Sequence, residues 1–281
     1  MPHFTLSAFA DEYSAALDKQ LEGLSLSGIS MLEPRFIDGT NISSISAKEA
    51  TRVANILDCA GISVYSVGSP IGKIAIDGDH AAHLDSARHS FENAAILSAK
   101  RVRVFSYYLP SGISRLDARC EVIDRLGTLL DLADEYGLTL CHENEAKIYG
   151  ESPEDAYDLI TATDGRLRAV FDMGNLALMG YDPIAAYHLL APYIEYFHIK
   201  DALSAGAIVP PGLGVARIPE ILSLHAENHG NTVLTLEPHL ETFSGLGRLT
   251  DSTFDNPYKY ETPESAFLDA AARLKKIIAE I

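Results

Sequence analysis

Short apolar segments typical of buried strands alternate with helical segments along the whole 281-residue chain. The segments expected as strands are 4–9, 30–33, 62–67, 101–105, 138–143, 167–172, 194–199 and 232–237. Those expected as helices are 15–26, 47–60, 80–98, 115–136, 153–161, 183–190, 218–227 and 263–281. Strict alternation favours a parallel sheet, and eight strand–helix units are the number that closes into a (β/α)8 TIM barrel.

Prolines and glycines mark where several of the helical segments begin and end. A capping residue followed by proline starts three of them, at 152–153, 182–183 and 262–263. Gly61 and Gly137 follow two others, where a left-handed residue is needed. An open, doubly wound sheet is the structural alternative. No Gly-x-Gly-x-x-Gly motif follows the first strand, so a dinucleotide-binding version of that sheet has little support.

Length and composition favour one domain that spans residues 1–281, because an α/β barrel of this size is commonly a single domain. The net charge of −17 argues against a nucleic-acid partner, which usually requires a basic face. Three scattered cysteines without CxxC spacing indicate reduced, mostly buried thiols rather than a disulfide framework or a zinc knuckle. No apolar run approaches the length of a membrane span, and the N-terminal segment lacks a basic signal-peptide region. We therefore expect a soluble cytoplasmic protein.

Two connections are longer than the usual loop after a barrel strand. Residues 202–217 follow the seventh expected strand, and residues 242–262 follow the eighth. Both leave the C-terminal ends of strands, which is the face where barrel enzymes carry their active sites. We expect residues 242–262, which contain four aromatic side chains, to form an active-site loop over a polar pocket.

Four consecutive strand segments each end on a side chain that can bind a metal: Glu143, Asp172, His198 and Glu237. They are separated by 29, 26 and 39 residues (143 to 172, 172 to 198, 198 to 237), which leaves room for a helix each time. Parallel strands would bring all four to the same end of the barrel. One such residue alone is usually solvated or caps a helix, but four at the same register predict a metal site. Carboxylates with one imidazole suit Mn²⁺, Mg²⁺ or Co²⁺.

Alternation along the strands separates side chains that face the site from those that face away. Glu143 shares a face with Cys141, whereas His142 points the other way and is expected to have a structural role. His198 shares a face with Lys200. Lys200 could bind a phosphate or carboxylate of the substrate, or it could be a surface charge paired with its neighbour.

Proline should fix the backbone at two strand ends, because the residue before a proline is held in the extended region. Glu237 precedes Pro238, so His239 should share its face and belong to the substrate pocket or its surroundings. Glu33 also precedes a proline and should reach the barrel mouth as a substrate-binding residue. Arg217 and Glu145 are further candidates for substrate contacts, and each could equally be a solvated surface charge.

Four motifs together resemble the xylose-isomerase-like TIM-barrel superfamily: Leu-Cys-His-Glu143, Phe-Asp172-Met-Gly-Asn175, Phe-His198-Ile-Lys200-Asp201 and Leu-Glu237-Pro-His239. The superfamily includes sugar-phosphate isomerases and epimerases, ketose 3-epimerases, inosose dehydratases and DNA-repair enzymes of the endonuclease IV type. The resemblance extends over essentially the whole chain, including Gly68-Ser-Pro-Ile-Gly-Lys73 after the third strand.

The resemblance implies that Glu143, Asp172, His198 and Glu237 bind one divalent ion, with Zn²⁺ as an alternative to the three metals above. It also implies that Glu143 and Glu237 act as acid and base on opposite faces of a sugar. A metal there would polarise a carbonyl and stabilise an enediolate. One carboxylate would remove a proton from carbon, and the other carboxylate, or the same one, would return it. Asn175 stands where the ketose-epimerase branch carries a substrate-binding histidine, so the sugar contacts should differ there.

The leading hypothesis is a metal-dependent isomerase or epimerase of a sugar or sugar-phosphate, which could form homo-oligomers as family members often do. The alternative is a lyase that dehydrates an inosose-like keto-polyol on the same scaffold. An abasic-site endonuclease is less favoured, because that chemistry uses several metals and histidines and the acidic chain opposes DNA. A non-catalytic sugar-binding relic is also less favoured, because the four-ligand set is intact.

Overall fold

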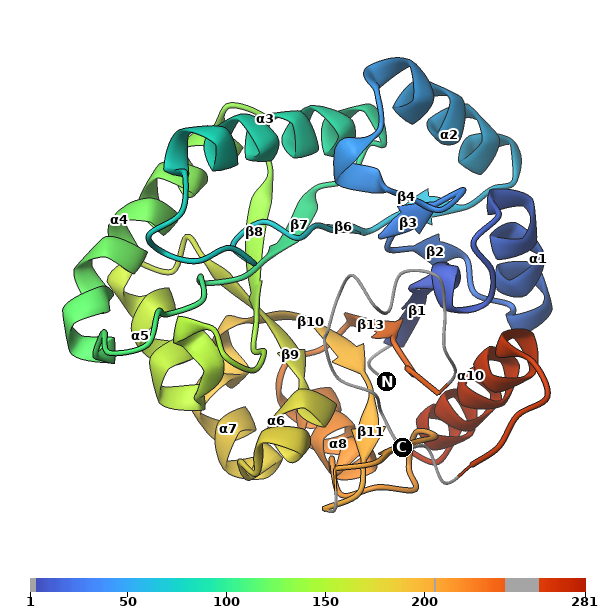
Figure 1. Ribbon diagram of the computed structural model, residues 1–281. Helices are drawn as coiled ribbons and strands as arrows, with labels where there is room; N and C mark the ends of the chain where they lie inside the picture. Colours follow the sequence, from blue (N-terminus) through green and yellow to red (C-terminus); the bar gives the residue numbers. More distant parts are fainter. Residues whose placement is uncertain (1–3, 205, 241–257) are drawn as a thin grey trace.

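Figure 1 shows the computed structural model, which describes residues 4–204, 206–240 and 258–281 and contains a ring of parallel strands surrounded by helices. The strand order in the central sheet is β5-β2-β1-β13-β10-β9-β8-β7-β6. The strands are β1 (Phe4–Ala8), β2 (Met31–Leu32), β5 (Ser63–Val64), β6 (Ser66–Gly68), β7 (Arg101–Val104), β8 (Thr139–Glu143), β9 (Arg168–Asp172), β10 (Ile194–Ile199) and β13 (Thr232–Leu236).

The two ends of this sheet are consecutive pieces of the chain. Only Tyr65 separates β5, which pairs with β2, from β6, which pairs with β7. The amide of Tyr65 still donates to the carbonyl of Leu32, at 3.1 Å, so the strand bends without leaving its neighbour. One interrupted strand thus closes the ring, and the predicted eight-stranded barrel is confirmed in place of an open sheet.

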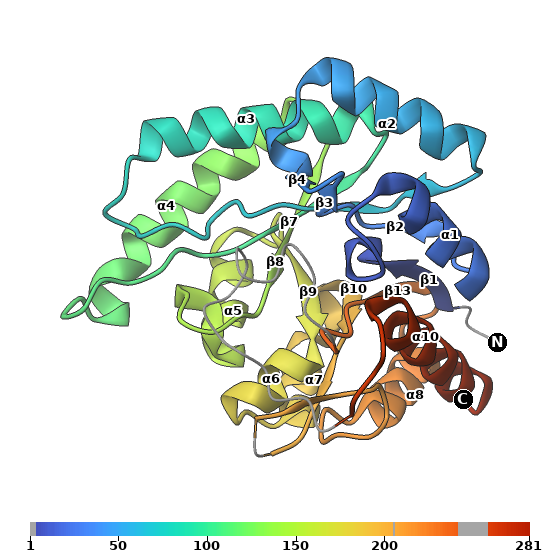
Figure 2. The same ribbon diagram turned by 45° about the vertical axis from the view of Figure 1, so that its right-hand side comes forward.

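Helices cover the outside of the ring, as two views separated by 45° agree (Figures 1 and 2). They are α1 (Leu17–Ser27), α2 (Ala47–Cys59), α3 (His80–Ile96), α4 (Arg115–Asp134), α5 (Pro153–Ala162), α7 (Pro183–Leu190), α8 (Ile218–Asn228) and α10 (Pro263–Ala279). The three expected capping residues do cap: Ser152, Asp182 and Thr262 each accept a hydrogen bond from a backbone amide in the first turn. The sequence did not predict α6 (Met173–Met179), a short helix that begins directly after β9.

The interior of the barrel has an apolar layer with a charged layer above it. Cys141, Val170 and Tyr196 form a buried cluster inside the ring together with Val233. Each of the first three lies two residues before Glu143, Asp172 or His198, so the next inward side chain along the strand is a predicted ligand. The apolar layer therefore closes the barrel below the strand ends and sets the direction in which the charged side chains point.

Two small hairpins interrupt the loops at the C-terminal ends of the strands. β3 (Phe36–Ile37) pairs with β4 (Thr40–Asn41) after β2, and β11 (Asp201–Ala202) pairs with β12 (Ile208–Val209) after β10. The second hairpin occupies part of the long connection at 202–217. Most of the expected active-site loop at 242–262 lies outside the described residues, so its role stays a prediction.

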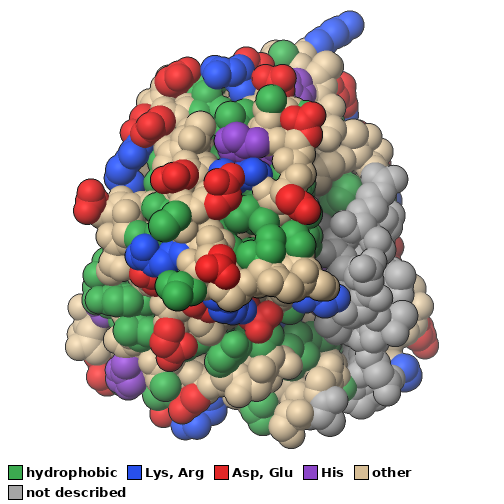
Figure 3. Space-filling view, turned by 60° about the vertical axis from the view of Figure 1, so that its left-hand side comes forward, with side chains coloured by type: hydrophobic (Ala, Val, Ile, Leu, Met, Phe, Trp, Pro, Cys, Tyr) green, Lys and Arg blue, Asp and Glu red, His purple; other side chains and the backbone are tan. Residues whose placement is uncertain are grey.

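The surface in Figure 3 has acidic and basic side chains interspersed with apolar ones, without a gathering of Lys and Arg on that face. All three cysteines are unpaired. The prediction of mostly buried thiols is wrong, because Cys59 and Cys120 lie on exposed faces of α2 and α4 and only Cys141 is buried. Among the helices of the described residues, none combines the length and the apolar composition needed to cross a membrane.

Candidate metal centre

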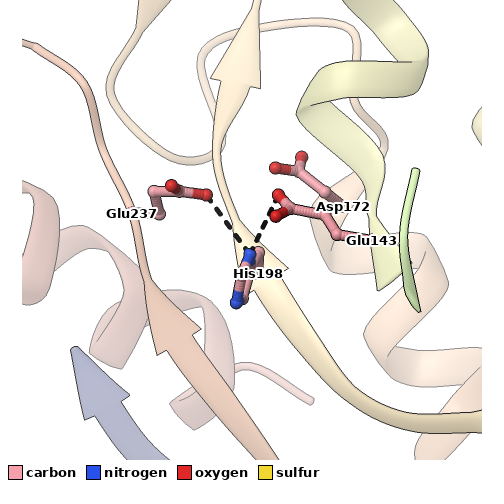
Figure 4. A group of neighbouring side chains, drawn as sticks. All are labelled: Glu143, Asp172, His198 and Glu237. Carbon is pink, nitrogen blue, oxygen red and sulfur yellow. Dashed lines mark hydrogen bonds and ion pairs between the residues drawn. The ribbon is translucent and has the colours of Figure 1, made fainter. Parts of the chain in front are cut away.

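The four predicted ligands converge at the C-terminal ends of β8, β9, β10 and β13. One ligand atom from each of Glu143, Asp172, His198 and Glu237 lies within 4.8 Å of the other three. His198 is the direct strand partner of Asp172, which confirms that they share one register. Figure 4 shows His198 between Glu237 on one side and Glu143 with Asp172 on the other. Nδ1 of His198 is 3.1 Å from Oε1 of Glu143 and 3.3 Å from Oε2 of Glu237.

The second nitrogen of His198 faces Glu33, deeper in the barrel. Nε2 lies 3.2 Å from Oε2 of Glu33, whose carboxylate also accepts hydrogen bonds from Tyr196, at 2.7 Å, and Thr235, at 2.8 Å. The side chain of Glu33 is fully buried. A carboxylate on one imidazole nitrogen fixes the ring and presents the other nitrogen to a metal. The side chain of Glu33 therefore runs into the barrel, where it supports His198, and a contact between Glu33 and a substrate stays a prediction.

Three buried cations contact the ligand carboxylates. Arg103, on β7, donates to Oε2 of Glu143 at 2.5 Å. Lys200, just after β10, donates to Oδ2 of Asp172 at 2.9 Å and has its Nζ 3.3 Å from Oε2 of Glu237. The third cation, Arg35, donates to Oε1 of Glu237 at 2.9 Å.

These cations keep two of the carboxylates ionised. Burial raises the pKa of Glu143, but His198 and Arg103 outweigh burial and hold that pKa well below its usual range. Burial is likewise outweighed at Glu237, where Lys200 makes the largest opposing contribution and the pKa is lowered. At Asp172 burial prevails over Lys200 and raises the pKa. Burial would lower the pKa of His198, but the carboxylates of Glu143 and Glu33 raise it well above its ordinary value.

The residues present fit a divalent ion. Three carboxylates and one imidazole are a suitable donor set. Oε2 of Glu237 has no hydrogen-bond partner within the described part of the chain, although two nitrogens lie 3.3 Å from it. Carboxyl groups also outnumber basic groups in this buried network: Asp11, Glu12, Glu33, Glu143, Asp172 and Glu237 face Arg35, Arg103, Lys200 and His198. Burial and neighbouring carboxylates, against the pull of Arg35, raise the pKa of Glu12 to about 8. A divalent ion bound among these carboxyl groups would stabilise their ionised forms.

Asn175, in the first turn of α6, lies inside the site. Its amide hydrogen atoms point to the carbonyl of Asn144, at 3.0 Å, and to Oε1 of Glu143, at 3.4 Å. Its Oδ1 accepts a hydrogen bond from Lys200 at 3.0 Å. Because Oδ1 of Asp172 accepts from the backbone amide of Asn175 at 2.8 Å, the metal-ligand candidate also caps α6. Lys200 shares the face of His198 as expected, and it pairs with Asp172 rather than with the adjacent acid.

His239 reaches the site by a turn and not by strand alternation. Its φ of 48° shows that the chain leaves the extended conformation directly after Pro238. Nε2 of His239 nevertheless lies 3.6 Å from Oε1 of Glu237 and 3.4 Å from Oε1 of Glu12. His142 faces away from the site, as predicted, with Nε2 2.9 Å from Oγ of Ser106.

The remaining two candidates lie further out. Glu145 accepts a hydrogen bond from Lys73 at 3.1 Å, and both side chains are partly exposed. Arg217 is exposed at the start of α8 and pairs with Glu220. Among the described residues no contact joins Arg217 to the four ligands, so the structure does not bring it into the site.

The sequence analysis missed Asp11, Glu12, Arg35 and Arg103. Sequence features could have identified the two acids and Arg103. Asp11 and Glu12 follow β1, so they are acids just past a strand end, the same pattern that identified the four ligands. Arg103 stands between valines in the middle of a buried strand, where a charged residue needs a buried partner.

The model of the xylose isomerase-like TIM barrel family matches residues 24–277 of this chain. The chain belongs to this family. An inosose dehydratase from Geobacillus kaustophilus (strain HTA426) is 31% identical over 81 residues, which are 28% of this chain and 26% of that protein. The fold of an L-ribulose 3-epimerase superposes with a TM-score of 0.78 at 16% identity, covering 100% of this chain and 95% of that one. The fold of the IOLI protein with a bound zinc atom superposes with a TM-score of 0.77 at 17% identity, covering 99% of each chain. The resemblance inferred from the motifs is thus confirmed at the level of family and fold.

Proposed function

We propose that this protein is a divalent-metal-dependent isomerase or epimerase that acts on a ketose or a related sugar or sugar-phosphate. One observation carries the proposal: Glu143 and Glu237, two carboxylates held ionised, lie on opposite sides of His198 within a single ligand set (Figure 4). An L-ribulose 3-epimerase has a similar fold, and an inosose dehydratase is similar in sequence over 81 residues, which agrees with sugar chemistry.

Bound at this site, the ion would polarise a substrate carbonyl and so make a proton on the neighbouring carbon easier to remove. Asp172 and His198 would only hold the ion, with Glu33 fixing the imidazole. Glu143 and Glu237 would hold it and also move protons, because an ionised carboxylate within reach of the carbon can accept one. Removal by one and return by the other on the opposite face gives an epimer. Return to the neighbouring carbon gives an isomer.

Other polar groups would orient the substrate. Asn175 and Lys200 lie beside the ligands and carry hydrogen-bond donors, while Glu145 and Lys73 lie nearer the solvent. The metal is proposed as Mn²⁺, Mg²⁺ or Co²⁺, with Zn²⁺ kept as an alternative because a protein of similar fold carries zinc. A cytoplasmic location and a homo-oligomeric state remain predictions from the sequence.

Proton exchange with solvent tests the proposal. The protein would be incubated with Mn²⁺ and a panel of ketoses in D₂O and followed by NMR. We expect deuterium to enter the carbon next to the carbonyl without loss of water. Glu237→Gln is nearly isosteric and should lower exchange about 10²-fold or more while the fold is retained. The matched control is Arg166→Gln, which alters an exposed ion pair. Failure of the wild-type protein to bind Mn²⁺, Mg²⁺, Co²⁺ or Zn²⁺ would contradict the proposal.

A dehydratase is the second candidate, and the similarity over 81 residues to an inosose dehydratase favours it. Dehydration begins with the same proton removal but requires an acid to protonate the departing hydroxyl. Lys200, between Asp172 and Glu237, has a proton to give at that place. The same NMR experiment separates the two reactions, because a keto-polyol that loses water gives a new product instead of an exchanged substrate.

A further inference from the structure

A second group of potential ligand atoms lies beside the first. Glu12, Glu237 and His239 each place an oxygen or nitrogen within 4.8 Å of the others, and all three side chains are buried. Glu237 belongs to both groups and divides its oxygens between them. Oε2 lies 3.3 Å from His198 in the first group, whereas Oε1 lies 3.6 Å from His239 in the second. One carboxylate shared by two ligand sets is the arrangement found where two metal ions are bridged.

The guanidinium of Arg35 lies among the ligand atoms of this second group. Nη1 is 2.9 Å from Oε1 of Glu237 and 3.5 Å from Nε2 of His239, and Nη2 is 3.1 Å from Oε1 of Glu12. Nε and Nη2 also donate to the two oxygens of Asp11, at 3.0 and 3.2 Å. The side chain is 1% exposed.

We propose that Arg35 takes the place of a second metal ion, and that it thereby limits the centre to one ion. An arginine is always charged and its planar fork matches carboxylate oxygens, so it can satisfy such a ligand set with no metal present. The side chain is fixed by the ring of Phe9, whose centroid lies 4.3 Å from Cζ of Arg35. Arg35 is therefore a positioning residue: it binds Oε1 of Glu237 and leaves Oε2 for the ion. This inference rests on the proposed metal centre.

A role in stability alone makes a different prediction. If Arg35 only neutralised buried acids, its loss would weaken folding and leave the number of bound ions unchanged. If it stands in for a metal, its loss opens a second site lined by Glu12, Glu237 and His239. The number of ions per chain thus separates the two roles, and it does so without reference to activity.

The test compares two double variants that remove the same charges. Arg35→Ala/Asp11→Asn keeps all three ligands of the second group, whereas Arg35→Ala/Glu12→Gln loses one of them. Each full-length protein would be dialysed against Co²⁺, and bound cobalt per chain would be measured by elemental analysis and by its visible spectrum. We expect one ion in the wild type, two in Arg35→Ala/Asp11→Asn and one in Arg35→Ala/Glu12→Gln.

The outcomes are distinguishable. One ion in all three proteins would overturn the role of Arg35 and leave the proposed function intact. No ion in the wild type would instead contradict the proposed function. Because the second acid is removed together with the arginine, neither double variant leaves more uncompensated charge than the wild type. If Arg35→Ala/Asp11→Asn nevertheless failed to fold, Arg35→Gln/Asp11→Asn removes the same charges but fills more of the volume of the arginine. Single-ion binding by Arg35→Gln/Asp11→Asn in excess Co²⁺, with circular dichroism like that of the wild type, would also overturn the inference.

Discussion

Replacement of Glu33 by glutamine should weaken metal binding without unfolding the protein. Glu33 receives three hydrogen-bond donors, from Tyr196, Thr235 and Nε2 of His198. In Glu33→Gln, the amide oxygen can still face Thr235 and His198 while the amide nitrogen faces Tyr196. The hydroxyl of Tyr196 can then donate to Ser66, 2.9 Å away. Every hydrogen bond is preserved in this arrangement, and only the negative charge is lost.

The magnitude follows from that single loss. A hydrogen bond to a charged acceptor is worth about 1.5–3 kcal/mol and one to a neutral acceptor about 0.5–1.5 kcal/mol, so His198 loses about 1–2 kcal/mol of support. Since about 1.4 kcal/mol is a factor of ten, metal affinity should fall roughly 5- to 30-fold. Folding of the metal-free protein should be little affected, because Glu33 belongs to a network with more acids than cations.

Isothermal titration with Mn²⁺ measures the affinity, and urea unfolding of the metal-free protein measures the stability. Tyr196→Phe is the matched control, since it removes a donor to Glu33 but keeps the charge that faces His198. The control should lose about 1–3 kcal/mol of stability, because it leaves a buried carboxylate oxygen without its partner, and little metal affinity. An affinity of Glu33→Gln within twofold of the wild type would refute the role assigned to Glu33.

Three further changes test other parts of the molecule. Lys200→Met leaves the carboxylates of Asp172 and Glu237 without their shared cation, so urea unfolding of the metal-free protein should show a loss of about 3–5 kcal/mol that Mn²⁺ partly restores. Burial lowers the pKa of His83 from 6.5 to about 4. As the pH falls below 6.5, the unfolded chain therefore takes up a proton at His83 before the folded chain does. The contribution of His83 to stability is complete above pH 6.5 and is lost as the pH falls toward 4. His83→Gln should make the loss of stability between pH 7.5 and 5 smaller by about 1 kcal/mol, after allowance for partial solvent access. Leu126→Ala should lower the free energy of unfolding, measured with urea, by about 2–5 kcal/mol, because the side chain is fully buried. The number of bound metal ions should not change, because Leu126 lies on α4, one of the helices outside the ring of strands.

The barrel was predictable from the sequence because its strands and helices follow local periodicities. All eight expected strand segments occur, and the capping residues at 152, 182 and 262 start helices where proposed. Two features that are short or irregular were not predicted: the seven residues of α6 begin directly after β9, outside every expected helix, and one barrel strand is interrupted at Tyr65. Both features involve too few residues to change the spacing of hydrophobic residues along the sequence, which is the pattern from which strands and helices were predicted.

The metal ligands were predictable for the same reason, whereas their partners were not. Glu143, Asp172 and His198 end strands, so the alternation of one strand at a time brings each to the mouth. The partners depend on where two distant segments meet. Arg35 contacts Glu237 across 202 positions of sequence, and Arg103 contacts Glu143 across 40. The residues that surround Arg35 or Arg103 in the sequence do not indicate which carboxylate each arginine will contact.

The layer of Cys141, Val170 and Tyr196 explains why the charges above it interact so strongly. A side chain that shields the barrel interior from water lowers the effective dielectric constant, and the attraction between opposite charges rises as that constant falls. The same burial would drive lone carboxylates to take up protons. Arg103 and Lys200 prevent this at Glu143 and Glu237, the two groups that must be ionised to accept a proton from a substrate. Alternation along β8, β9 and β10 therefore has two effects. It points Glu143, Asp172 and His198 into the site, and it places beneath them a buried layer in which neighbouring cations strongly influence the charge of the carboxylates.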